Sequence, residues 1–109
     1  MEKHILPKEI VKGYYYHYKH NPEKGFNDYS YEVVGIGRNT EEGGDKEYKV
    51  LYRPLYSNDW MEPADYQSRP YSMFIEDVVH NGETVPRFRL ITDTQVIEKL
   101  KEIKEKMYN

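Results

Sequence analysis

Cysteine is absent from the 109 residues of this chain. That absence excludes disulfides, thiolate metal ligands and cysteine nucleophiles, and it is typical of proteins in a reducing compartment. The chain also lacks any stretch of about 18 apolar residues, and residues 1–9 contain no apolar run long enough for a signal peptide. We therefore expect a cytoplasmic protein that is neither exported nor inserted in a membrane.

A broad basic excess is missing as well. The chain has 16 Lys and Arg residues against 19 Asp and Glu residues, which gives a formal net charge of -3. Non-specific binding to duplex nucleic acid draws on such an excess, so general coating of DNA or RNA is disfavoured. A local basic patch that recognises one nucleotide is compatible with this charge sum.

Motifs for catalysis are scarce. The chain has no Gly-x-Ser-x-Gly elbow, and Gly35-Ile36-Gly37 lacks the third glycine and the following helix of a dinucleotide site. Adjacent Glu76 and Asp77 point to opposite faces of a strand, so they do not form an acid and base pair. His17 and His20 are a weak metal pair for the same reason. We predict no catalytic residues, no metal and no cofactor, and an enzyme is the less favoured class.

Tyrosine, by contrast, is abundant, with 12 of the 109 residues. The run from Tyr14 to Lys19 is too aromatic for a preferred helix and follows a glycine, so we predict a first strand there. Successive side chains of a strand point to opposite faces. One face then carries Tyr14, Tyr16 and Tyr18, and the other carries Tyr15, His17 and Lys19.

Two further strands are predicted at residues 29–37 and 47–53, where β-branched and aromatic residues are frequent. Residues 57–69 show neither the helical nor the strand period, and they contain several turn-forming residues. We predict a loop that lies over the sheet, with Trp60 and Tyr66 as its anchors.

Asn81-Gly82 is the strongest hairpin signal in the chain. It lies between two predicted strands, at residues 73–80 and 84–91. A two-residue turn at this position places Glu76 opposite Arg87, which favours a salt bridge between the two side chains.

The last segment has apolar residues at helical spacing and charged residues between them, which predicts an amphipathic helix over residues 93–107. Thr92 is the expected N-cap, with Gln95 at the third helical position of a capping box. We expect the apolar stripe to cover one face or open end of the sheet, and a partner-binding helix is the alternative.

These elements predict a single, mainly β domain over residues 1–109. Five short strands over residues 12–91, followed by one C-terminal α-helix, favour a small, partly open five-stranded antiparallel β-barrel, because a curled sheet hides its edges.

Five blocks of the chain occur in this order: Gly13-x-Tyr15-x-His17-Tyr18-Lys19, Tyr31-x-Val33-x-Gly35-x-Gly37-x-x-Thr40-Glu41, Tyr52-Arg53-x-Leu55-Tyr56, Arg69-Pro70-x-x-Met73-Phe74-x-Glu76-x-Val78 and Gly82-x-x-x-Pro86-Arg87-Phe88. Together they cover about residues 12 to 90, and the pattern resembles the DUF1653 family of small bacterial proteins. The resemblance implies an SH3-like barrel whose biochemical role is uncharacterised, and it supplies no catalytic residues.

A surface of phenol and guanidinium groups is suited to binding, since a tyrosine face stacks a base or packs a proline while an arginine holds a phosphate or carboxylate. The candidate binding residues are Tyr15, His17, Tyr52, Arg53, Tyr56, Arg69 and Arg87. The preferred ligand is an anionic small molecule or a nucleotide. A peptide- or protein-binding module and a structural subunit are the alternatives.

A purely structural role for the same residues is also open. In that interpretation most of the tyrosines fill the core of a small barrel, and the arginines pair with Glu32, Glu76 or Asp77.

Overall fold

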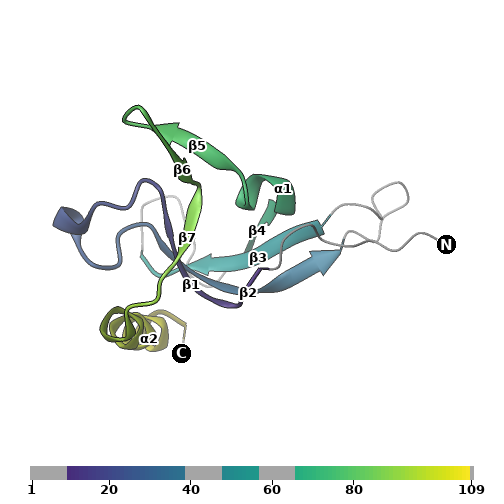
Figure 1. The fold of residues 1–109 in the computed structure, drawn as a ribbon. Helices are drawn as coiled ribbons and strands as arrows, with labels where there is room; N and C mark the ends of the chain where they lie inside the picture. The colour runs from purple at the N-terminus through teal and green to yellow at the C-terminus, as the bar shows by residue number, and fades with distance from the viewer. Residues whose placement is uncertain (1–9, 39–47, 57–65, 109) are drawn as a thin grey trace.

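The computed structural model describes residues 10–38, 48–56 and 66–108. Within these residues a five-stranded antiparallel sheet has the order β4-β3-β2-β1-β7, and a separate two-stranded ribbon pairs β5 with β6 (Figure 1). The sheet strands are β1 (Gly13–His17), β2 (Ser30–Arg38), β3 (Tyr48–Pro54), β4 (Gln67–Pro70) and β7 (Phe88–Leu90). The ribbon strands are β5 (Asp77–His80) and β6 (Glu83–Pro86). The helical elements are the 3-10 turn η1 (Pro22–Lys24), the short helix α1 (Tyr71–Phe74) and the C-terminal helix α2 (Thr94–Tyr108).

The predicted fold class is confirmed, since antiparallel strands precede one long C-terminal helix. The described strands form an open sheet, with β4 and β7 at its two edges. The SH3-like arrangement of the strands stays a prediction. None of the helices among the described residues is long and apolar enough to cross a membrane.

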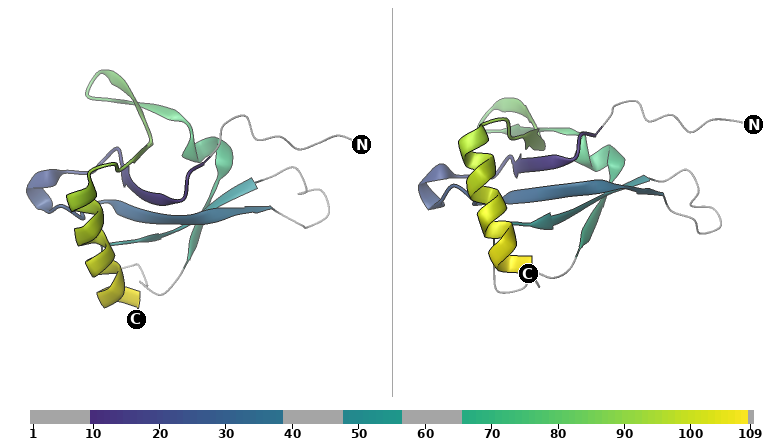
Figure 2. Two further views of the ribbon diagram at one scale, coloured as in Figure 1. Left: turned by 60° about the horizontal axis from the view of Figure 1, so that its bottom comes forward. Right: turned by 90° about the horizontal axis from the view of Figure 1, so that it is seen from below.

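The sheet carries a separate hydrophobic cluster on each face, as the alternation of β1 predicts. Tyr14 belongs to the cluster that packs against α2, together with Leu55 and Leu100. Tyr15 belongs to the other cluster, together with buried aromatic residues from β2, β3, α1 and β7. We call these the helix face and the hairpin face. Figure 1 shows α2 and the β5–β6 hairpin on opposite sides of the sheet, and the view from below in Figure 2 shows α2 crossing in front of the strands.

Helix α2 covers one face of the sheet as predicted, but its N-cap differs from the predicted one. The Asp93 carboxylate accepts hydrogen bonds from the backbone N–H groups of Gln95, at 2.9 Å, and Val96, at 3.4 Å. Asp93 therefore caps the helix, and Thr92 does not. A carboxylate is also the better partner for the positive end of the helix dipole, which explains why Asp93 holds this position.

The hairpin at Asn81-Gly82 is confirmed. Asn81 has φ 53° and Gly82 has φ 79°, the left-handed values that a two-residue hairpin turn requires. The two predicted strands are shorter than expected, because residues 71–74 are helical and the second strand breaks at Arg87. At Arg87 the chain leaves β6, the partner of β5, and continues as β7, which pairs with β1.

One predicted loop contains a strand. Residues 67–70 form β4, which pairs with β3 from Tyr52↔Gln67 to Lys49↔Pro70. The sequence pattern did not indicate this edge strand, because its side chains are polar and an edge strand needs no alternating apolar residues. Trp60 lies outside the described residues. Tyr66 is exposed, with its ring 5.1 Å from the guanidinium carbon of Arg53.

Candidate functional site

A polar concave site on the hairpin face is a pocket of about 420 Å³, which we call the Arg69 pocket. It is open to solvent and is built from the end of β1, the start of β2, and strands β3 and β4. Its lining residues are His17, Lys19, Tyr29, Tyr31, Tyr52, Tyr56, Gln67, Ser68 and Arg69. No acidic side chain is among them. The pocket therefore combines phenol rings with cationic groups.

His17 forms one side of this pocket and is buried at the end of β1. Its Nδ1 accepts a hydrogen bond from the backbone N–H of Lys19, at 3.1 Å, so the proton of the neutral ring lies on Nε2. Burial is the main cause that lowers the pKa of His17 from 6.5 to about 4, and the positive charges of Arg69, Lys19 and Arg87 contribute to the same shift. The ring is thus neutral at physiological pH and offers an N–H donor.

Arg69 lies opposite Val50 in the pairing of β4 with β3. Its guanidinium carbon is 5.4 Å from the centre of the Phe88 ring, which places the group over the hydrophobic cluster of the hairpin face. The buried Nε of Arg69 has no hydrogen-bond acceptor among the described residues. The Nε of Arg87 is buried without an acceptor in the same way. A buried N–H without an acceptor is costly, so an acceptor brought by a ligand would be favourable at these guanidinium groups.

Tyrosine hydroxyls form the remaining polar surface of the pocket. The hydroxyls of Tyr31 and Tyr56 are 2.5 Å apart, and the Tyr31 ring makes an edge contact with Tyr52 at 5.2 Å between centroids. Burial raises the pKa of Tyr31 and of Tyr56, since the phenolate would lose its hydration. Both phenols stay neutral at ordinary pH and add no negative charge to the pocket.

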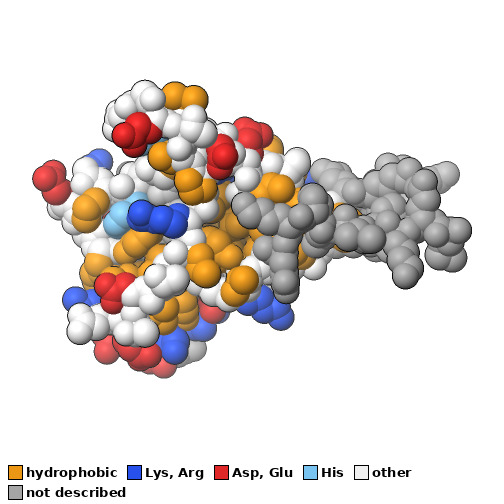
Figure 3. Space-filling model, in the orientation of Figure 1, with side chains coloured by type: hydrophobic (Ala, Val, Ile, Leu, Met, Phe, Trp, Pro, Cys, Tyr) orange, Lys and Arg blue, Asp and Glu red, His pale blue; other side chains and the backbone are white. Residues whose placement is uncertain are grey.

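The structure brings together four of the seven predicted binding residues, namely His17, Tyr52, Tyr56 and Arg69. Arg87 lies near them, since its charge acts on His17, but its Nη2 pairs with the Glu76 carboxylate at 3.1 Å. The predicted Glu76–Arg87 salt bridge is therefore present. Figure 3 shows histidine and basic side chains next to one another, among hydrophobic side chains, below the β5–β6 hairpin.

Two predicted binding residues lie elsewhere. Tyr15 shares a sheet face with His17 but is a core residue, with its ring against Phe74 and its hydroxyl donating to the Val11 carbonyl at 2.6 Å. Arg53 lies on the helix face and pairs with the Glu32 carboxylate at 3.1 Å. Both positions agree with the structural interpretation of these residues.

Five lining residues were not predicted. The alternation of β1 already put Lys19 on the face of His17, so this signal was available. Gln67 and Ser68 were assigned to a loop, and the start of β2 gave no indication that Tyr29 and Tyr31 reach the same pocket. Tyr29 has φ 50°, a turn conformation that the sequence did not indicate for a tyrosine.

Among the described residues no group of three or more His, Asp or Glu side chains is arranged to hold a metal ion. His20 contacts the Asp28 carbonyl through Nδ1 at 2.5 Å, and its ring stacks on Tyr16 at 3.7 Å.

The fold and the pocket together define a small, mainly β domain with a cationic, tyrosine-lined cavity on one face of an open sheet. The chain belongs to DUF1653, a family of proteins of unknown function, whose model matches residues 13–90. A crystal structure of a DUF1653 protein from Bordetella bronchiseptica is similar, with a TM-score of 0.57 and 25% sequence identity. The match covers 76% of this chain and 88% of that one. No curated protein matches the sequence. The predicted family resemblance is thereby confirmed.

Proposed function

We propose that this domain binds a small anionic ligand, a phosphate- or carboxylate-bearing molecule or a nucleotide, in the Arg69 pocket. Arg69, Lys19 and the Nε2 of His17 supply the donors, and the tyrosines supply the walls. Arg69 carries this proposal, because among the described residues its buried Nε lacks an acceptor and no acidic side chain lines the pocket. A guanidinium binds phosphate or carboxylate through paired, charge-assisted hydrogen bonds.

The electrostatics of the pocket support an anion. Three cationic side chains lower the pKa of His17, so the potential at the ring is positive although the whole chain carries a net charge of -3. A concave site lined by one sign of charge concentrates ions of the opposite sign. An anion at this position lowers the repulsion among the cationic groups.

The test is calorimetric titration of inorganic phosphate and pyrophosphate into the wild type, Arg69→Gln and Lys101→Gln. Loss of the charge-assisted bonds should weaken anion binding by about tenfold or more in Arg69→Gln. Lys101 is exposed on α2, so Lys101→Gln removes the same charge from the opposite side of the sheet and should bind as the wild type does. Equal affinities in all three proteins would refute the proposal.

A second candidate is recognition of an apolar peptide, and a specific observation favours it. A pocket of about 360 Å³ lies beside the edge strand β7, lined mostly by apolar side chains that include Tyr15, Phe74 and Leu90. An edge strand beside an apolar pocket is the arrangement used when a peptide adds to a sheet. Titration of proline-rich and apolar peptides into the wild type and Leu90→Glu tests this candidate, because the glutamate should abolish such binding. Sedimentation of the protein alone tests whether the same surface makes it a structural subunit.

A further inference from the structure

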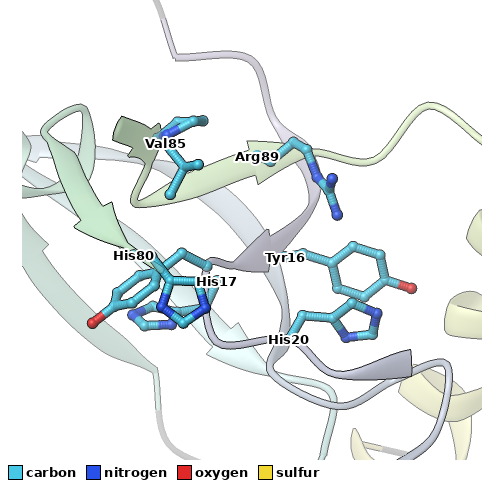
Figure 4. A pocket seen from close by; sticks show the side chains of 8 residues that line it. Tyr16, His17, His20, His80, Val85 and Arg89 are labelled. Carbon is cyan, nitrogen blue, oxygen red and sulfur yellow. The ribbon is translucent and has the colours of Figure 1, made fainter. Parts of the chain in front are cut away.

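A second cavity, of about 320 Å³, lies between β1 and the β5–β6 hairpin (Figure 4). We call it the hairpin cavity. Its lining includes five ring side chains, Tyr16, His17, Tyr18, His20 and His80, and one cationic side chain, Arg89. It is lined by no acidic residue among those that the structure describes. The Arg69 pocket also has five ring side chains, but two cationic side chains, Lys19 and Arg69, line it where only Arg89 lines the hairpin cavity among the described residues.

The rings are held in place by contacts with one another. Tyr16 and His20 stack at 3.7 Å with an interplanar angle of 13°, and Figure 4 shows this pair on one side of the cavity and His80 on the other. His80 makes an edge contact with Tyr18 at 5.3 Å. The guanidinium carbon of Arg89 is 5.7 Å from the centre of the Tyr16 ring. Ordered aromatic walls beside a guanidinium suit a planar, electron-rich ring.

The two cavities meet at one side chain. His17 lines both, and its ring lies 4.4 Å from Tyr18, in the hairpin cavity, and 5.4 Å from Tyr29, in the Arg69 pocket. The distances are between ring centroids. An aromatic cavity and a cationic pocket therefore share one wall residue, His17.

We infer that the two cavities hold the two parts of a single mononucleotide, with the base in the hairpin cavity and the phosphate in the Arg69 pocket. This inference rests on the proposed anion binding at Arg69. A nucleotide carries a planar ring and an anion a short distance apart, which matches the adjacent aromatic and cationic cavities. Stacking of a base on aromatic side chains raises affinity about tenfold in comparable sites.

The experiment compares inorganic phosphate, adenosine and adenosine 5′-monophosphate by calorimetric titration of the full chain. Adenosine 5′-monophosphate should bind at least tenfold more tightly than phosphate or adenosine. Tyr18→Leu keeps the bulk of the wall but removes the π face, so it should weaken the nucleotide about fivefold or more and leave phosphate unchanged. Arg69→Gln should weaken both. Tyr66→Leu is the matched control, because Tyr66 is exposed and lines neither cavity.

His80→Ala is the second variant, since His80 is exposed on the hairpin and its loss should leave the fold intact. It should weaken the nucleotide and spare phosphate, as Tyr18→Leu does. If phosphate binds and the nucleotide binds no more tightly, the base site is refuted and the anion site stands. If phosphate and nucleotide both fail to bind, both proposals fall. If a single-stranded oligonucleotide binds and the mononucleotide does not, the inference is overturned, and the ligand is the end of a nucleic-acid strand.

Discussion

The two faces of the sheet differ in how their charged side chains are paired. On the helix face Glu32 accepts from Arg53 at 3.1 Å and from Lys104 at 2.8 Å, and Arg53 lies 4.1 Å from the centre of the Tyr108 ring. On the hairpin face none of the described residues that line the pocket of Arg69 is acidic, and the imidazole beside Arg69 is neutral at physiological pH. Where α2 covers the sheet, the cationic side chains Arg53 and Lys104 are paired with Glu32. In the Arg69 pocket the described charged side chains are all positive.

This difference separates two arginines that look equivalent in the sequence. Arg53 and Arg69 each adjoin a proline on neighbouring strands, but their side chains belong to opposite faces. A partly buried ion pair contributes to a defined fold, whereas a cation without a counter-charge costs stability unless a ligand supplies one. Stability and binding can therefore be tested separately, one face at a time.

The largest expected effect comes from the helix face. Leu100 is fully buried between α2 and the sheet. Leu100→Ala leaves a cavity there and should lower the free energy of unfolding by about 2–5 kcal/mol. Urea denaturation followed by circular dichroism measures the change, with the exposed Lys101→Ala as control. A loss below about 1 kcal/mol would mean that α2 contributes little to the fold.

Removal of charge should next distinguish the two faces. Glu32→Gln takes the carboxylate away from both Arg53 and Lys104 and should cost about 1–3 kcal/mol of stability. Arg69→Gln removes a cation from a pocket in which no described lining residue is acidic, and it should cost less than about 0.5 kcal/mol or stabilise the protein. Denaturation of both variants in the same buffer makes the comparison. A larger loss for Arg69→Gln would show that Arg69 is mainly structural.

A further expected effect is a pH dependence from His17. Its pKa falls from the ordinary 6.5 to about 4 in the folded protein, with burial as the main cause and Arg69, Lys19 and Arg87 adding to it. Between pH 4 and pH 6.5 the unfolded chain binds more protons than the folded one. The stability that neutral His17 contributes is therefore fully present above pH 6.5 and is lost as the pH falls toward 4. Melting temperatures of the wild type and His17→Gln across this range isolate the contribution.

Sulfate sharpens this measurement, since its charge does not change over the same range. An anion in the Arg69 pocket favours protonated His17, so sulfate should reduce the loss of stability at low pH in the wild type. The effect should be smaller in Arg69→Gln and in His17→Gln. If the melting temperatures of the wild type and His17→Gln depend on pH in the same way, both with and without sulfate, the neutral imidazole and the anion site are both contradicted.

Local patterns in the sequence were sufficient for much of the fold. The alternation at Tyr14 and Tyr15 assigned two faces correctly, the Asn81-Gly82 turn fixed the register that pairs Glu76 with Arg87, and helical spacing identified α2. Each of these signals lies within a few residues of the structure that it specifies.

The site depended on contacts across strands, which local patterns do not reveal. Arg69 reaches His17 because β4 joins the edge of the sheet, and the polar sequence of β4 gave no period to detect. Without that strand, Arg53 and Arg69 could not be assigned to different faces. Tyr15 was misplaced for a related reason, because two residues on one face of a strand can lie in different cavities.

His17 lines both the Arg69 pocket and the hairpin cavity. A molecule held in one cavity that changes the charge or position of this ring must therefore change the affinity of the other. Thermodynamic reciprocity makes that factor the same in both directions. One shared imidazole would couple the two proposed sites without a second domain or a change of fold.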